Sequence, residues 1–212
     1  MKKIIFSLLV SIAIIHSSCI TSWQPLFNRT TAIADDRLTG IWNSDGQDYT
    51  VQKFYESDYA KSMPGYKEQK SESKSGNDKD DSILLSKTYI INYTKDTIKY
   101  NMFGVMVKLN GQFFMNFTAI DMGQWASRKA TFTIARVQFS NSNTIKLDFI
   151  DGSYVYDQIK AGRMKLKHES DELYDTFLIT ASTNELQQFI QKYGNDNRFF
   201  DKENSVTLIR KS

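Results

Sequence analysis

The chain has 212 residues, of which 41% are hydrophobic and 13% aromatic, which is enough to build a core of appreciable size. Its 27 Lys and Arg and 24 Asp and Glu give a net charge of only +3 and are scattered, so the charge pattern does not indicate nucleic-acid binding. A single cysteine excludes an internal disulfide. Two histidines are too few for the usual Cys and His ligand sets of zinc.

Residues 1–18 have the layout of a secretory signal. Two lysines precede an apolar stretch from Ile4 to Ile15, and small residues then lead to Cys19. This stretch is too short to span a bilayer, which takes roughly 20 residues. The segment resembles a bacterial lipobox, although His16 stands where an aliphatic residue is commoner. The resemblance implies that residues 1–18 are removed and that Cys19 is lipidated, so that acyl chains anchor the protein to the membrane.

Residues 19–37 show no sustained periodicity and are predicted to form a solvated tether between the membrane and the folded domain. The alternative is that Trp23, Leu26 and Phe27 contact the domain or the lipid surface. The folded domain is predicted to occupy residues 38–212.

Within this domain the sequence predicts a series of short strands. Residues 64–82 are polar and charged, and they are predicted to form a mobile loop because they cannot bury enough surface to offset ordering entropy. Asn110-Gly111 predicts a tight hairpin, since both residues tolerate positive φ. Another hairpin is predicted around Asn141-Ser142-Asn143. The predicted strands cover residues 38–42, 48–55, 83–93, 97–109, 112–121, 131–140, 144–150, 164–168, 173–179 and 205–210.

Two helices are predicted. Residues 153–161 form the first, which ends at Gly162. The second begins with a capping box, in which Ser182 and Glu185 satisfy free backbone N–H groups of the first turn. Its apolar residues follow at helical spacing and are Leu186, Phe189, Ile190 and Tyr193. This helix is expected to pack across a barrel opening or against an outer wall.

Many short strands and few helices indicate an antiparallel sandwich or barrel. Gly40 and Trp42 form a Gly-x-Trp motif that resembles the signature of the lipocalins and their calycin relatives. In those families a basic residue of the last strand lies over the tryptophan, and Arg210 is placed to do so here. The predicted fold is therefore mainly β, an antiparallel lipocalin-like β-barrel with two short helices. The alternative is that Trp42 is an ordinary core residue and Arg210 a surface charge.

Two further stretches, residues 105–117 and 177–200, resemble a group of bacterial proteins with this lipocalin-like layout. The resemblance implies the fold and export from the cytoplasm. It brings no catalytic or ligand-binding residues with it, because none are established for the group.

No arrangement of residues indicates catalysis. His168 is followed by Glu169, but it is expected to be a strand-edge residue, not a catalytic base. No glycine-rich phosphate loop is present. The sequence therefore predicts no enzyme, no catalytic residues, no metal site and no cofactor.

The hairpin at Asn110-Gly111 is rich in Met and Phe. Met106, Phe113, Met115 and Phe117 are candidates to line a pocket for an apolar ligand, or else to fill the barrel core. We expect a lipid-anchored lipoprotein of the cell envelope, on the periplasmic side of the outer membrane, that binds a small hydrophobic molecule. The alternative is a protein-interaction or inhibitor module without such a ligand. No nucleic-acid partner is expected.

Overall fold

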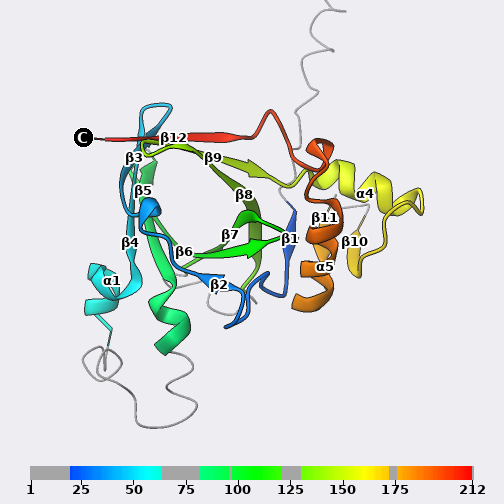
Figure 1. Cartoon of the computed structure of the whole chain (residues 1–212), viewed down its shortest axis with the longest axis horizontal. Coiled ribbons are helices and arrows are strands. Elements are labelled where there is room, and N and C mark those ends of the chain that lie inside the picture. The colour runs from blue at the N-terminus through cyan, green and yellow to red at the C-terminus, as the bar shows by residue number, and fades with distance from the viewer. Residues whose placement is uncertain (1–19, 64–81, 96, 121–129, 172–175, 212) are drawn as a thin grey trace, which may run out of the picture.

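The computed structural model describes residues 20–63, 82–95, 97–120, 130–171 and 176–211 (Figure 1). The signal segment 1–18, Cys19 and residues 64–81 of the predicted loop lie outside the described residues. The strands are β1 Thr21–Ser22, β2 Ala32–Ile33, β3 Gly40–Ser44, β4 Gln47–Lys53, β5 Thr88–Lys95, β6 Ile98–Leu109, β7 Gln112–Ala119, β8 Phe132–Asn141, β9 Thr144–Phe149, β10 His168–Asp171, β11 Thr176–Ile179 and β12 Val206–Arg210. The helices are α1 Asp58–Lys61, residues 82–86, α4 Gly152–Lys160 and α5 Thr183–Tyr193.

Eight strands close into an antiparallel barrel. The strands from β3 to β9 pair with their neighbours in chain order, and β12 pairs with both β9 and β3, which completes the ring (Figure 1). Closure leaves no exposed edge within the ring. The predicted fold class, a mainly β lipocalin-like antiparallel barrel, is confirmed, and so are the two predicted helices, which are α4 and α5. Among the described residues there are two further short helices that the sequence did not predict, α1 and residues 82–86.

Tight two-residue turns join several of the strands. Asn110 and Gly111 have φ values of 47° and 80°, as expected for the turn that joins β6 to β7. Asp45 and Gly46 have φ values of 50° and 79° and join β3 to β4 in the same way. The sequence reading did not single out this second turn.

Two predicted strands begin much later in the structure than in the prediction. Residues 82–86 are helical, and β5 begins only at Thr88. A short apolar run such as Ile83–Leu85 has no periodicity that separates a strand from a buried helical turn. Residues 164–167 lie outside any strand, and β10 begins at His168.

Residues 20–27 pack against the outside of the barrel and β2 pairs with β6, which differs from the predicted tether. β1 runs parallel to β11 and antiparallel to β8. The Leu26 side chain is fully buried, its amide donates to Asn116 Oδ1 at 2.8 Å, and its carbonyl accepts from Gln187 Nε2 at 2.7 Å. The alternative expectation, that Leu26 and Phe27 contact the domain, is therefore correct for these two residues. The Phe27 ring meets Phe132 edge to face.

The second large core lies outside the barrel. α5 and the N-terminal segment cover the outer faces of β6, β7 and β8, and Figure 1 shows α4 and α5 on the same side of the barrel. Of the two positions expected for α5, it occupies the outer wall. Gly194 ends the helix close to the barrel, since a Cβ added there would lie 3.3 Å from Phe114 Cζ of β7 and also 2.6 Å from Ile190 O of α5 itself. The core includes Leu26, Val107, Phe114, Ile134, Val155, Leu186, Phe189 and Phe199.

The predicted capping box is present at the start of α5. Ser182 Oγ accepts from the Glu185 amide, and the Ser182 amide donates to Glu185 Oε2 at 2.8 Å. We expect Ser182→Ala to lower the free energy of unfolding by about 1 kcal/mol, measured by urea denaturation, because a first-turn N–H loses its acceptor. Ser182→Asp retains an acceptor and is the control. Equal losses for the two variants would show that the cap is not what stabilises this end.

Candidate functional site

The interior of the barrel is an apolar cluster to which every barrel strand contributes. Three of the four predicted pocket residues, Met106, Met115 and Phe117, are buried within it. The fourth, Phe113, is half-buried and packs against the same cluster.

The middle of this interior is filled by the protein's own side chains. Gly104 on β6 faces inward, and a Cβ added there would lie 2.9 Å from Ile91 Cδ1 and 3.1 Å from Met115 Sδ. Met106 and Met115 are at most 2% exposed. Flexible methionines fill irregular gaps of this kind. In this part of the barrel the residues therefore fit a packed core better than a ligand pocket.

One end of the barrel is closed around Trp42. The Arg210 guanidinium carbon lies 4.2 Å from the centroid of the Trp42 ring, so the cation–π contact expected from the sequence is present. Arg210 Nη1 also donates to Thr39 O at 2.7 Å, and Trp42 Nε1 donates to Leu38 O at 2.8 Å. Gly40 has a φ of 134°, and a Cβ there would collide with Arg210 Nη1. The glycine of the motif thus makes room for the arginine.

A second arginine covers the same end. The Arg37 guanidinium carbon lies 3.8 Å from the centroid of the Phe139 ring and 5.7 Å from that of Phe113. Arg37 also pairs with Asp35, and its hydrogen bond lowers the pKa of that carboxyl. The Asp35 amide donates to the buried Tyr89 hydroxyl at 2.6 Å. The segment from Asp35 to Thr39 therefore closes this end of the barrel.

We expect Arg210→Ala to lower the free energy of unfolding by about 1–2 kcal/mol, because it removes the contact with Trp42 and the hydrogen bonds to Thr39 and Arg37 carbonyls. Thermal or urea unfolding measures this loss. Arg210→Lys retains the charge without the planar guanidinium, so its stability should lie between those of the wild type and Arg210→Ala. An unchanged midpoint for Arg210→Ala would contradict a stabilising role for the pair.

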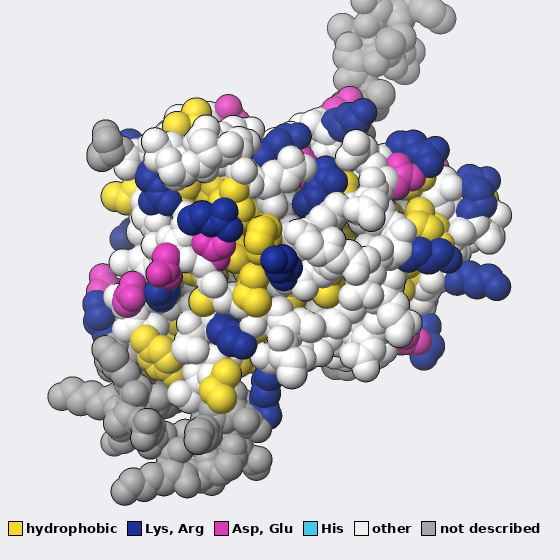
Figure 2. All heavy atoms as spheres, in the orientation of Figure 1, with side chains coloured by type: hydrophobic (Ala, Val, Ile, Leu, Met, Phe, Trp, Pro, Cys, Tyr) yellow, Lys and Arg dark blue, Asp and Glu magenta, His cyan; other side chains and the backbone are white. Residues whose placement is uncertain are grey.

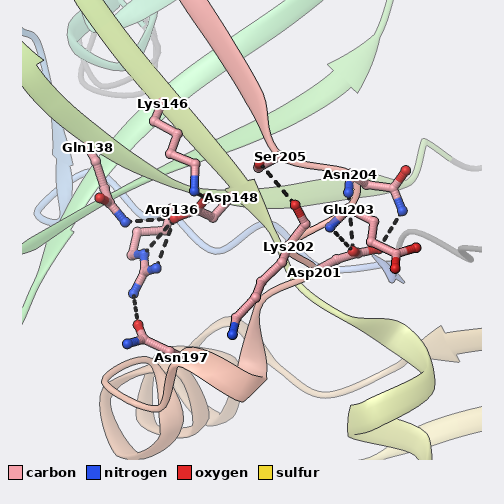
Figure 3. A network of polar contacts seen from close by, with 10 residues as sticks. All are labelled: Arg136, Gln138, Lys146, Asp148, Asn197, Asp201, Lys202, Glu203, Asn204 and Ser205. Atoms are coloured by element: carbon pink, nitrogen blue, oxygen red, sulfur yellow. Dashed lines mark hydrogen bonds and ion pairs between the residues drawn. The ribbon is translucent and has the colours of Figure 1, made fainter.

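A polar network lies on the outer wall of the barrel (Figure 3). Asp148 on β9 accepts from Arg136 Nη2 at 2.8 Å and Gln138 Nε2 at 2.6 Å, and pairs with Lys146 Nζ at 2.8 Å. Arg136 also stacks on the ring of Phe200, 3.9 Å from its centroid. Burial raises the pKa of Asp148, but the hydrogen bonds and charges of Lys146 and Arg136 outweigh it, so that the pKa lies below its ordinary value. The network therefore links side chains of β8 and β9 across the outer wall.

A groove of about 950 Å³ lies beside the barrel, between α4, residues 162–167 and α5. Apolar side chains form its floor, and they are Ile159, Met164, Leu166, Phe189 and Tyr193. Its rim is polar and consists mainly of Arg163, Lys165, Lys167, Glu185, Gln188 and Lys192. An apolar surface with a few polar groups around it is typical of a small-molecule site.

The rim of the groove has four cations and one carboxylate, Glu185. Glu185 already accepts from the Ser182 hydroxyl and amide, which lower its pKa, and Lys167 Nζ lies 3.6 Å from its Oε1. Arg163 Nε donates to an amide oxygen, that of Gln158. Figure 2 shows Lys and Arg side chains around a small exposed hydrophobic area over α4 and the segment after it. The groove is therefore apolar below and positively charged above.

The sequence reading missed this groove. Its signal is an alternation over residues 163–167, in which Arg163, Lys165 and Lys167 are exposed while Met164 is buried and Leu166 half-buried. Such alternation reads as a half-buried strand, and only the fold brings it opposite α5.

Other chemistry is sparse in the part of the chain that the structure describes. It has no group of three His, Cys, Asp or Glu side chains placed to hold a metal ion. His168 Nδ1 lies 2.9 Å from Leu166 O, and the ring packs near Phe177. Among the same residues, no helix is both long and apolar enough to cross a bilayer.

Comparisons of the chain with protein-family models, with curated proteins and with solved structures found no match.

Proposed function

We propose that this protein is a binding module of the bacterial cell envelope that holds a small hydrophobic molecule in the groove between α4 and α5. The observation that supports this is the apolar floor of the groove beside a barrel whose middle is filled. In this proposal the barrel is a rigid scaffold, and the ligand site lies on its outer wall. The proposal includes no enzymatic reaction.

The proposed location is the periplasmic side of the outer membrane, with lipidated Cys19 as the anchor. Ile20, the next residue, is 2% exposed and belongs to the outer core. An anchor at Cys19 would therefore hold the domain close to the bilayer. Labelling with radioactive palmitate should be lost in Cys19→Ala, and labelling that persists would contradict the anchor.

Binding can be tested on a chain that starts at Ile20. Every contact described above lies within residues 20–211, so this chain contains the complete barrel and both large cores. We expect the neutral fluorescent probe N-phenyl-1-naphthylamine to bind and Leu166→Gln to weaken its binding, because the substitution places a polar group on the floor. Ile209→Gln is the matched control, because Ile209 is an aliphatic residue outside the groove and is 58% exposed. Equal affinities for both variants would contradict the groove as the ligand site.

A second candidate function is protein interaction, and the position of β10 favours it. β10 is the last strand in the sheet order, outside the closed ring, and its described pairing is with β11 on one side. An exposed strand edge can pair with a strand of another protein. A photo-crosslinker at Glu169 should then give a discrete adduct that Ser170→Pro abolishes, and a crosslinker at Thr207 should give none. Absence of the Glu169 adduct would exclude this mode.

A further inference from the structure

We infer that the ligand of the groove is an anionic amphiphile, a molecule with one apolar chain and a negatively charged carboxylate or phosphate head group. This inference rests on the proposed function, since it names the chemical class of the molecule that the groove holds. Two features of the groove support it. The rim has an excess of positive charge, and cations alternate with apolar side chains over residues 163–167.

The charges around the groove are not balanced by the protein itself. Lys167 is the one rim cation with a carboxylate partner among the described residues, and its 3.6 Å contact with Glu185 joins side chains that are 72% and 45% exposed. Lys192 Nζ lies 5.0 Å from the centroid of the Tyr193 ring. A negatively charged head group would give the rim cations an opposite charge, whereas a neutral ligand would leave their positive charge uncompensated.

Arg163 is suited to bind such a head group directly. Its Nε donates to Gln158 Oε1 at 2.7 Å, which fixes the plane of the guanidinium. Among the described residues no contact engages its Nη1 and Nη2 groups, which can form a bidentate pair with a carboxylate or a phosphate. Lys165 and Lys167 follow at alternate positions on the same side of the groove.

The apolar part of the ligand has a matching surface. Met164 and Leu166 alternate with the cations and point to the opposite side, where they meet Phe189 and Tyr193 of α5. Leu166 and Tyr193 are only half-buried. An acyl chain on this floor would cover them while its head group remained at the rim. A molecule with both parts therefore fits better than a simple hydrocarbon or a small anion.

The experiment compares two lysolipids with the same acyl chain, both below their critical micelle concentrations. Titration calorimetry on the chain that starts at Ile20 should show tighter binding of lysophosphatidylglycerol, which is anionic, than of lysophosphatidylcholine, which is zwitterionic. The double variant Lys165→Gln/Lys192→Gln should bind the anionic lipid about tenfold more weakly and should bind the zwitterionic lipid with unchanged affinity. Raising the salt concentration should reduce the difference between the two lipids.

The matched control is Lys99→Gln/Lys202→Gln, which removes the same charge from exposed sites that do not line the groove. Equal affinities for the two lipids, with both weakened by Leu166→Gln, would overturn the anionic ligand but retain the groove as an apolar site. Binding of neither lipid would count against the proposed function as well. Binding of glycerophosphoglycerol, the head group without a chain, as tightly as the lysolipid would overturn the amphiphile. Equal thermal midpoints of the variants exclude unfolding as the cause.

Discussion

Asp148→Ala should lower the free energy of unfolding by about 3 kcal/mol, one of the two largest single-residue effects that we expect in this barrel. Asp148 and Arg136 have side chains that are only 4% and 13% exposed, and they lie 2.8 Å apart on neighbouring strands. Without the carboxylate, the arginine remains largely out of water with no opposite charge. Urea denaturation at neutral pH measures the loss.

The matched control is the pair of Asp48 and Lys211. These side chains are 47% and 51% exposed and lie 2.6 Å apart, so the contact is as short as that of Asp148 but lies in water. Asp48→Ala should lower the free energy of unfolding far less than Asp148→Ala does, because water screens the exposed pair. A similar loss at both sites would show that burial does not determine the effect.

The same carboxylate gives a pH dependence. The pKa of Asp148 is below its ordinary value of 3.8 in the folded protein and returns to that value on unfolding. The stability that depends on its charge is therefore present above about pH 4 and is lost as the pH falls through the folded-state pKa. We expect the unfolding free energies of the wild type and Asp148→Ala to differ at pH 6 and to converge at lower pH. A constant difference at all pH values would contradict this account.

Trp42→Ala should lower the free energy of unfolding by about 3–5 kcal/mol. Trp42 is 1% exposed, packs within the interior cluster and lies beneath Arg210 at the closed end. Its removal leaves a cavity at that end and the Leu38 carbonyl without its donor. Urea denaturation monitored by circular dichroism measures the change without relying on the fluorescence of the missing tryptophan.

Two variants test the cause of that loss. Trp42→Phe retains most of the buried ring and should be less destabilising than Trp42→Ala. Ile41→Ala changes the adjacent residue, which points outward and is 49% exposed, so it should be close to neutral. If Ile41→Ala were as harmful as Trp42→Ala, the effect would come from strand propensity and not from the packed interior.

Much of this fold could be predicted because its signals are local. Asn110-Gly111 fixes a turn through positive φ, and Ser182 with Glu185 fixes a helix start through hydrogen bonds three residues apart. The contact of Trp42 with Arg210 is not local, and it was predicted through the resemblance of Gly-x-Trp to the lipocalin signature. Strand propensity alone would not have joined these residues.

The groove could not be predicted because its residues come from separate elements. Leu166 and Phe189 meet only after α5 has packed on the outer wall, and no spacing in the sequence encodes that contact. For a similar reason, contact of Leu26 with the domain was only the alternative to the predicted tether. Its partners, Asn116 and Gln187, lie 90 and 161 positions away, so the segment looks like a linker until its surroundings are known.

The way in which the two ends of the chain meet sets an order on its assembly. Thr183 Oγ1 donates to Pro25 O, and Arg210 Nη1 donates to Thr39 O, across 158 and 171 positions. Neither contact can form until nearly the whole polypeptide has emerged, and such distant contacts slow folding. Pro25 and Thr39 therefore lack these partners until the C-terminal part of the chain has been synthesised. A chain that stops short of β12 would leave β3 and β9 with unpaired edges that invite aggregation.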